Sequence, residues 1–256
     1  MRTSKGVRQT AEKRVRTTMM DGRSELDAKN ELDFLWRHFR SWLHFRLLAA
    51  RGWLRHGHFI RARAIRNYLE THQLRKVHLG STYPLNGFLN SQITDAVPID
   101  INRRLPFPNN SLDLIYNSHV VEHIHRRQFH AFLKECLRVL RPGGKLAIST
   151  PSIKNLVAVL YGADDQARDI LLNRARMHSS EGFHSPGQHL NIVMRAYGHR
   201  WLYDTEYATK VGELIGFSKS YAVDNLAIPD PALVEYLKAR KSPGWFLETE
   251  TFLFEK

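Results

Sequence analysis

The chain has 256 residues, of which 43% are hydrophobic and 25% charged, as in a globular protein with a full core. A single cysteine excludes an intramolecular disulfide, and no apolar run is long enough to cross a bilayer. The formal net charge of +13 is unevenly placed, because residues 1–76 hold 18 Lys and Arg against 7 Asp and Glu, whereas residues 77–256 hold 20 against 18.

The first part of the chain differs in pattern from the rest. Residues 1–23 are polar, Arg-rich and aperiodic, which predicts a disordered basic tail, and no secretory signal follows Met1, so we expect a cytoplasmic protein. Residues 24–75 predict a helical extension whose second helix covers roughly Trp53–His72.

Two interpretations of the extension remain open. Helices with one apolar stripe usually bury it against protein, which would pack the two helices on the domain, on each other or on a protein partner. A basic aromatic pair of helices is also suited to the anionic inner surface of a membrane, which would make the protein peripheral there.

A short apolar strand is predicted at Lys76–Leu79, and Gly80 ends it. The next strand begins near Phe88, so the connection is shorter than the ~10–12 residues that a crossover helix with its loops requires. The first crossover helix is therefore expected to be missing or reduced.

The segment Leu105–Pro151 predicts one strand–helix–strand crossover of a parallel sheet. Leu112–Ile115 and Lys145–Thr150 are the strands, each preceded by a turn signal rich in Pro, Asn or Gly. Between them, apolar residues recur at three- and four-residue steps and define one helix face: Phe129, Phe132, Leu133, Cys136, Leu137 and Leu140. Cys136 on this face is expected to be a packed thiol rather than a nucleophile.

This segment resembles the corresponding region of class I S-adenosylmethionine-dependent methyltransferases, through LPFPNNSLDLIYNSHVVEH and LRVLRPGGKLAISTP. The likeness extends over roughly residues 76–256, and is greatest to compact methyltransferases associated with bacterial surface-glycan pathways. It implies an α/β fold with a doubly wound, mostly parallel sheet of the Rossmann-like type, with S-adenosyl-L-methionine as the cofactor.

The resemblance also implies where the cofactor binds. Gly80 corresponds to the position of close backbone approach, Gln92 to the ribose acceptor, and Asp100 to the acceptor for the adenine amino group. The other residues assigned to this cofactor site are Ser81, Ile101 and Asn117. Two positions depart from the family pattern, because Ser81-Thr82 replaces a second glycine and Gln92 replaces an acidic residue.

His119 and His123 are the candidate catalytic residues, with His119 as the general base because histidine titrates near neutral pH. The alternative is that His119 only lines the pocket. His119-Val-Val-Glu-His123 also matches a zinc-protease pattern, but that pattern needs a long helix and here it directly follows a strand. We therefore predict no metal, and a helix-stabilising role remains open for Glu122.

Residues of about 161–200 form an insertion after the last predicted strand. Its stretch His178–His189 is rich in Ser, Gly and His and predicts either a mobile cover over the acceptor or a solvated connector. His184, His189 and Tyr203 are the residues assigned to substrate binding.

The function predicted from the sequence is methyl transfer to a hydroxyl of a small molecule or glycan. A catalytically inactive, methyltransferase-like binding or scaffold protein is the alternative, and an RNA methyltransferase is a third. A nucleic-acid partner is disfavoured because the basic excess lies outside the methyltransferase-like part.

Overall fold

The chain divides by its contacts into two units, Met1–Arg46 and Leu47–Lys256. A computed structural model describes residues 58–81, 84–92, 97–175, 184–239 and 243–256, all in the second unit. The predicted basic tail and the first predicted helix of the extension lie outside these residues. Within them, no helix combines the length and the apolar character needed to cross a membrane.

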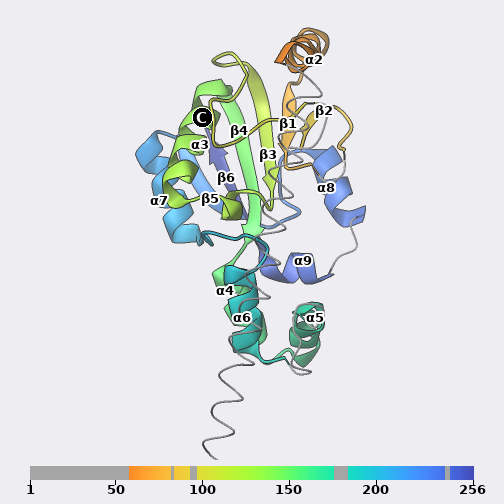
Figure 1. Cartoon of the computed structure of the whole chain (residues 1–256), viewed down its shortest axis with the longest axis vertical. Helices are drawn as coiled ribbons and strands as arrows, with labels where there is room; N and C mark the ends of the chain where they lie inside the picture. The colour runs from red at the N-terminus through yellow and green to blue at the C-terminus, as the bar shows by residue number, and fades with distance from the viewer. Residues whose placement is uncertain (1–57, 82–83, 93–96, 176–183, 240–242) are drawn as a thin grey trace, which may run out of the picture. The chain divides into compact units, whose positions relative to one another are not determined.

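Six strands form one sheet in the order β2-β1-β3-β4-β6-β5 (Figure 1). The strands are β1 (Lys76–Leu79), β2 (Phe88–Ser91), β3 (Leu112–Ser118), β4 (Leu140–Pro151), β5 (Lys219–Val223) and β6 (Thr249–Glu255). The first four pair in parallel, and β6 pairs antiparallel with both β4 and β5. The predicted doubly wound, mostly parallel sheet is confirmed.

The described helices flank the sheet or follow its strands. They are α2 (His58–Thr71), the 3₁₀ turn η1 (Val121–His123), α3 (Arg126–Val139), α4 (Ile153–Leu160), α5 (Asp165–Ala175), α6 (Pro186–Arg195), α7 (Thr205–Ile215), α8 (Pro231–Ala239) and α9 (Pro243–Glu248). The predicted apolar face of α3 is confirmed, since Phe129, Phe132, Leu133 and Cys136 are fully buried.

Both faces of the sheet are covered, as the period-2 alternation of buried strands requires. On β6, Phe252 and Phe254 belong to the core beneath α2, α3 and α7, whereas Leu253 faces the core of α8 and α9. Figure 1 shows α3 and α7 on one side of the sheet and α8 on the other. Burial on both faces explains why these strands read as continuous apolar runs.

The connection from β1 to β2 is short, as predicted, and carries no helix in its described residues. Gly80 and Gly87 both adopt left-handed backbone angles, with φ of 80° and 76°, and so turn the chain at its two ends. Residues 97–99, which precede Asp100, form no regular strand. The Ile99 amide donates to Ser91 Oγ at 3.0 Å, and Arg61 donates to the Pro98 carbonyl at 3.4 Å.

Helix α2 is an integral part of the described unit. Ile65 and Tyr68 are buried in the main core, and the Tyr68 hydroxyl donates to the carbonyls of Lys76 and Gly87 at 2.7 and 2.9 Å. The predicted domain boundary after residue 75 therefore falls within this unit. For α2, Ile65 and Tyr68 thus pack on the domain, whereas Ile60 on the same helix is 54% exposed.

The insertion builds a small core of its own. Leu156, Leu160, Leu171 and Val193 from α4, α5 and α6 form a separate buried cluster. The expected cover His178–His189 is in part the first turn of α6, because Ser185 caps the helix by accepting from the Gln188 amide and Pro186 suits its first position. Residues 178–183 lie outside the described residues.

Glu135 and Arg138 on α3 fasten the chain segment that leads into β3. The Glu135 carboxylate accepts from the Leu105 amide at 2.9 Å and from Arg138 at 2.6 Å, while Arg138 also donates to the carbonyls of Leu105 and Phe107. The hydrogen bond from Arg138 is the main reason that the pKa of Glu135 lies below its usual value.

We expect Glu135→Gln to lower the free energy of unfolding by about 1–3 kcal/mol near pH 7, because the bonds then lose charge assistance. A carboxyl group whose pKa is lower in the folded than in the unfolded protein stabilises the fold at pH values above the unfolded pKa of about 4.3. This stabilisation is lost as the pH falls through the folded pKa. Urea unfolding at pH 7 and pH 3 measures the difference between the two proteins. An equal difference at both pH values would contradict the assignment.

Candidate active site

The carboxyl ends of four parallel strands meet along one edge of the sheet, where open α/β folds bind ligands. Gly80 follows β1, Gln92 follows β2, Asn117 is near the end of β3, and Ser152 follows β4. The fold thus brings the predicted cofactor residues of the first three strands to a common edge.

Gly80 lies tightly against the segment that follows β3. A Cβ atom built on Gly80 would lie 2.0 Å from Val120 Cγ2, so a side chain there would have to displace Val120. The neighbouring Ser81 is buried, and both amides donate to the Ser91 carbonyl, at 2.9 and 3.1 Å. The glycine is thus required by packing within the protein, a reason that the sequence pattern did not reveal.

Asn117 is a buried amide at the carboxyl edge of the sheet. It is fully buried between Leu79 of β1 and Ile148 of β4, and neither its amide nitrogen nor its side-chain oxygen has a hydrogen-bond partner in the described residues. The hydroxyl of Ser118 is also buried without a hydrogen-bond partner in the described residues. Buried polar groups without partners are costly, and such groups are suited to a polar ligand or ordered water.

The two remaining acceptor candidates differ in their surroundings. Gln92 is half-buried at the end of β2. Asp100 is engaged in its own turn, since Oδ1 accepts from the Asn102 amide at 2.9 Å and Oδ2 lies 3.4 Å from Arg103 Nε. Ile101 is buried in the main core. Asp100 keeps free lone pairs for a further donor, because each carboxylate oxygen can accept two bonds.

His119 is fixed at both ring nitrogens. Its Nδ1 lies 3.3 Å from Glu122 Oε1, and its Nε2 lies 3.0 Å from Thr249 Oγ1 on β6. Because an ionised carboxylate can only accept, the neutral ring donates through Nδ1 and accepts the Thr249 hydroxyl at Nε2. The backbone of His119 is left-handed, with φ of 53°, which turns the side chain out of the strand direction.

Glu122 is a fully buried carboxylate. Burial raises its pKa, but the hydrogen bond from His119 and the charges of His119, His123 and His199 outweigh burial, so the pKa lies below its usual value. Thr150 Oγ1 donates to Oε2 at 3.2 Å. Glu122 lies in the 3₁₀ turn η1 rather than in α3, so its contacts do not support the helix-stabilising role considered from the sequence.

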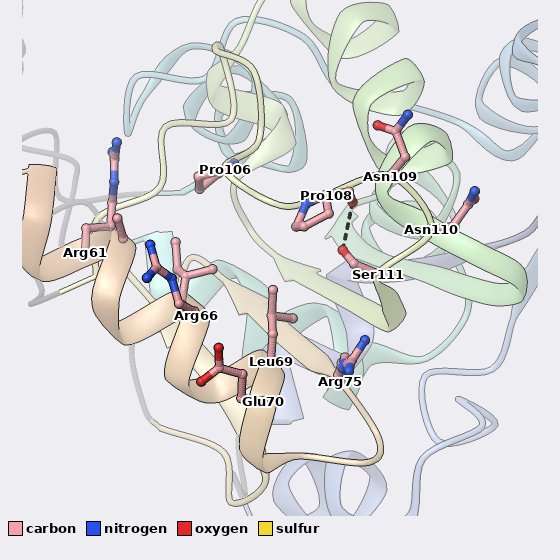
Figure 2. Close-up of a pocket in the computed structure, with 12 residues that line it drawn as sticks. Arg61, Arg66, Leu69, Glu70, Arg75, Pro106, Pro108, Asn109, Asn110 and Ser111 are labelled. Atoms are coloured by element: carbon pink, nitrogen blue, oxygen red, sulfur yellow. Dashed lines mark hydrogen bonds between the residues drawn. The ribbon is translucent and has the colours of Figure 1, made fainter.

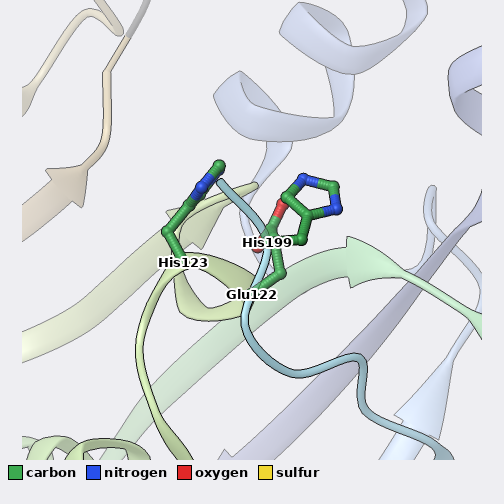
Figure 3. A group of neighbouring side chains, drawn as sticks. All are labelled: Glu122, His123 and His199. Atoms are coloured by element: carbon green, nitrogen blue, oxygen red, sulfur yellow. The ribbon is translucent and has the colours of Figure 1, made fainter. Parts of the chain in front are cut away.

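His123 and His199 lie beside this carboxylate, as Figure 3 shows. One ligand atom from each of the three residues lies within 4.8 Å of the others. The His199 Nδ1 donates to the Val193 carbonyl at 2.5 Å, and burial is the main cause that lowers the pKa of its ring. His199 comes from the segment between α6 and α7, far from Glu122 in sequence.

The residues assigned to substrate binding are dispersed. His184 is half-buried ahead of α6, and His189 is buried within that helix. Tyr203 is fully buried, with its ring centroid 4.2 Å from that of Phe129, and burial raises the pKa of its hydroxyl. The position of the Tyr203 side chain is thus explained by its packing in the core.

The sequence analysis did not assign three residues that contact this site: Thr150, His199 and Thr249. Thr249 reaches His119 only because β6 inserts antiparallel between β4 and β5. His199 is held because the amides of Arg200 and Trp201 donate to the Glu122 carbonyl at 2.7 and 3.3 Å. No local pattern signals either contact.

A cavity of about 620 Å³ lies at the opposite, amino edge of the sheet. It lies between α2 and the turn that precedes β3, and Figure 2 shows the arginines Arg61, Arg66 and Arg75 on one side and Pro108 with Ser111 on the other. Since Arg75 and Ser111 immediately precede β1 and β3, this cavity is separate from the carboxyl edge.

Comparison with known sequences finds similarity in the central region of the chain. Residues 83–148, from the β1–β2 connection through most of β4, match the family model described as a methyltransferase domain. A probable S-adenosylmethionine-dependent methyltransferase of Mycolicibacterium smegmatis is 46% identical over 48 residues, which are 19% of this chain and 18% of that protein. One of Mycobacterium tuberculosis is 33% identical over 75 residues, 29% of this chain and 23% of that protein. The matches thus span less than a quarter of either relative.

Solved structures align over more of the chain. A S-adenosylmethionine-dependent methyltransferase from Archaeoglobus fulgidus aligns with a TM-score of 0.40 and 13% identity, covering 77% of this chain and 93% of that one. One from Mesorhizobium loti aligns with a TM-score of 0.40 and 14% identity, covering 76% of this chain and 96% of that one.

The packing of Gly80 gives a matched pair of substitutions. We expect Gly80→Ala to lower the free energy of unfolding by about 3 kcal/mol, because it combines a left-handed backbone with a clash at Val120. Gly87→Ala is the control, since it has a similar φ but nothing nearer than 3.9 Å, and it should cost about 1 kcal/mol. Equal losses in thermal unfolding would show that Val120 does not restrict the site.

Proposed function

We propose that this protein is an S-adenosylmethionine-dependent methyltransferase acting on a hydroxyl of a small molecule or glycan. The observation that carries the proposal is the methyltransferase-domain match over residues 83–148, which includes β2, β3 and most of β4. These are strands whose carboxyl ends form the candidate site. The mycobacterial relatives support the same activity and the same cofactor.

The residues at the carboxyl edge fit such a cofactor. Asn117 offers a buried amide without a partner in the described residues, which can donate to and accept from a polar ligand. Gln92 and Asp100 would accept from hydroxyl and amino groups, with Asp100 providing the charge. Gly80 keeps the main chain after β1 free of a Cβ.

When bound, S-adenosylmethionine would supply a methyl group from its sulfonium: the acceptor oxygen forms a bond to the methyl carbon in line with the breaking carbon–sulfur bond, and S-adenosylhomocysteine leaves as a neutral thioether. The protein has to align the acceptor hydroxyl and to remove its proton. His119 is the proposed base. Glu122 orients its ring and stabilises the imidazolium that forms, as in other paired bases. The acceptor hydroxyl would replace Thr249 at Nε2, the atom that takes the proton.

Titration of the full chain with S-adenosylhomocysteine by calorimetry tests cofactor binding. We expect saturable binding, and a loss of about 1–3 kcal/mol in Asp100→Ala if the ligand loses a buried acceptor. Asp113→Ala is the matched control, because Asp113 is at the amino end of β3 and bonds to Arg75 there. Unchanged affinity in a folded Asp100→Ala protein would refute the role of Asp100.

Absence of binding in the wild-type chain would overturn the enzymatic proposal. It would favour the inactive scaffold instead, because Val120 already fills the space beside Gly80. Binding without turnover on any hydroxyl acceptor would leave the cofactor assignment intact and refute the acceptor class.

Methyl transfer to a panel of sugars and small alcohols tests the base. We expect His119→Ala to reduce kcat by roughly 10²–10⁴-fold with nearly unchanged cofactor affinity, since a general base acts in the transition state. His130→Ala is the control, because His130 is on α3, where its ring bonds to Tyr207. Normal turnover of His119→Ala would reduce His119 to a lining residue.

The basic excess of residues 1–76 belongs to the same proposal. Eighteen Lys and Arg against seven acidic residues are suited to an anionic membrane surface or an acidic protein partner. Either would bring the enzyme to an acceptor that is itself attached to a surface.

A further inference from the structure

The structure holds a cluster of metal-ligating side chains in which Glu122, the residue proposed to orient His119, meets two histidines that the proposed methyl transfer does not use. Its members are Glu122 and His123 from η1 and His199 from the segment before α7, and Figure 3 shows that two separate stretches of chain supply them. We propose that Glu122, His123 and His199 form a binding site for a divalent transition-metal ion such as Zn²⁺.

The ligand set has the right chemistry. One carboxylate and two imidazoles are a combination that binds Zn²⁺ and related first-row ions, and three protein ligands leave a position open for water or a substrate oxygen. This set differs from the one weighed in the sequence, because the structure pairs His123 with the distant His199 rather than with His119.

The distances are within reach of coordination. Bonds of about 2.0–2.2 Å to a tetrahedral ion place ligand atoms roughly 3.4 Å apart. The three atoms lie within 4.8 Å of one another, so the widest pair must close by about 1.4 Å at most. His123 is not fully buried, so its ring has room to supply this movement by side-chain rotation.

The surrounding hydrogen bonds point to a ligand. A metal-bound histidine usually donates its other ring N–H to a backbone carbonyl, which fixes the tautomer, and His199 donates Nδ1–H to the Val193 carbonyl. This bond leaves the Nε2 lone pair available. On Glu122, Thr150 donates to Oε2 and His119 Nδ1 lies 3.3 Å from Oε1, and each carboxylate oxygen has a second lone pair that can bind an ion.

The backbone holds the two parts of the cluster together. The amides of Arg200 and Trp201 both donate to the Glu122 carbonyl, which anchors the residues next to His199. Folding itself therefore brings the two ligand-bearing segments together before any ion binds. A preorganised set of this kind costs less to close around an ion.

The proposal stands independently of methyl transfer, because its test measures metal binding by the protein alone. The untagged full chain is titrated with Zn²⁺ by calorimetry and with Co²⁺ by visible absorption, whose bands report the coordination geometry. We expect one ion to bind per chain at this site. The Co²⁺ absorption bands should indicate imidazole and carboxylate ligands and a coordination number below six.

Substitutions locate the ion. His199→Gln and Glu122→Gln should each weaken binding by about 100-fold or more, because even residues that only orient a ligand contribute about 10–100-fold. His130→Gln is the matched control and should bind as the wild type does, since His130 on α3 lies outside the cluster. Zn²⁺ should also raise the melting temperature of the wild type and of His130→Gln but not of His199→Gln.

Two results would overturn the proposal. One is the absence of saturable binding in the wild type, and the other is binding that His199→Gln leaves unchanged, which would assign the ion to another part of the chain. If Glu122→Gln fails to fold, His123→Gln replaces it, because its partly exposed ring can be changed without opening the core.

Discussion

The buried charge of Glu122 is the constraint on which the candidate site depends. A carboxylate withdrawn from water loses several kcal/mol of solvation unless nearby groups compensate it. Here His119 and Thr150 approach its two oxygens, and the backbone carbonyl accepts from Arg200 and Trp201. Satisfying this one group draws together the segment after β3, strand β4 and the segment after α6. The base candidate and the metal cluster are both consequences of that arrangement.

The sheet determines where these groups can meet. Parallel strands end at one edge, so Gly80, Asn117 and Ser152 face the same region although they are far apart in sequence. The antiparallel strand β6 then adds Thr249 from the C-terminal end of the chain, next to β4. The tight packing of Gly80 on Val120 ties the first strand to the same segment that carries His119 and Glu122.

The insertion contributes structure as well as length. Its buried cluster of Leu156, Leu160, Leu171 and Val193 shows that α4, α5 and α6 pack on one another. That packing positions Val193, whose carbonyl accepts the His199 ring proton. Helix α6, whose first turn overlaps the stretch His178–His189 predicted as a cover or connector, thus holds His199 through Val193.

The sequence by itself determined the elements that depend on local patterns. The apolar period of α3, the strand Lys76–Leu79 and the short β1–β2 connection were predictable, because helix and strand periodicity and chain length act over a few residues. Only the tertiary structure decided that Val120 fills the space beside Gly80, that Tyr203 is core, and that His199 and Thr249 join Glu122 and His119. Those contacts join residues up to 130 positions apart. They arise from burial of the Glu122 charge and from the addition of β6 to the sheet, and neither leaves a local pattern in the sequence.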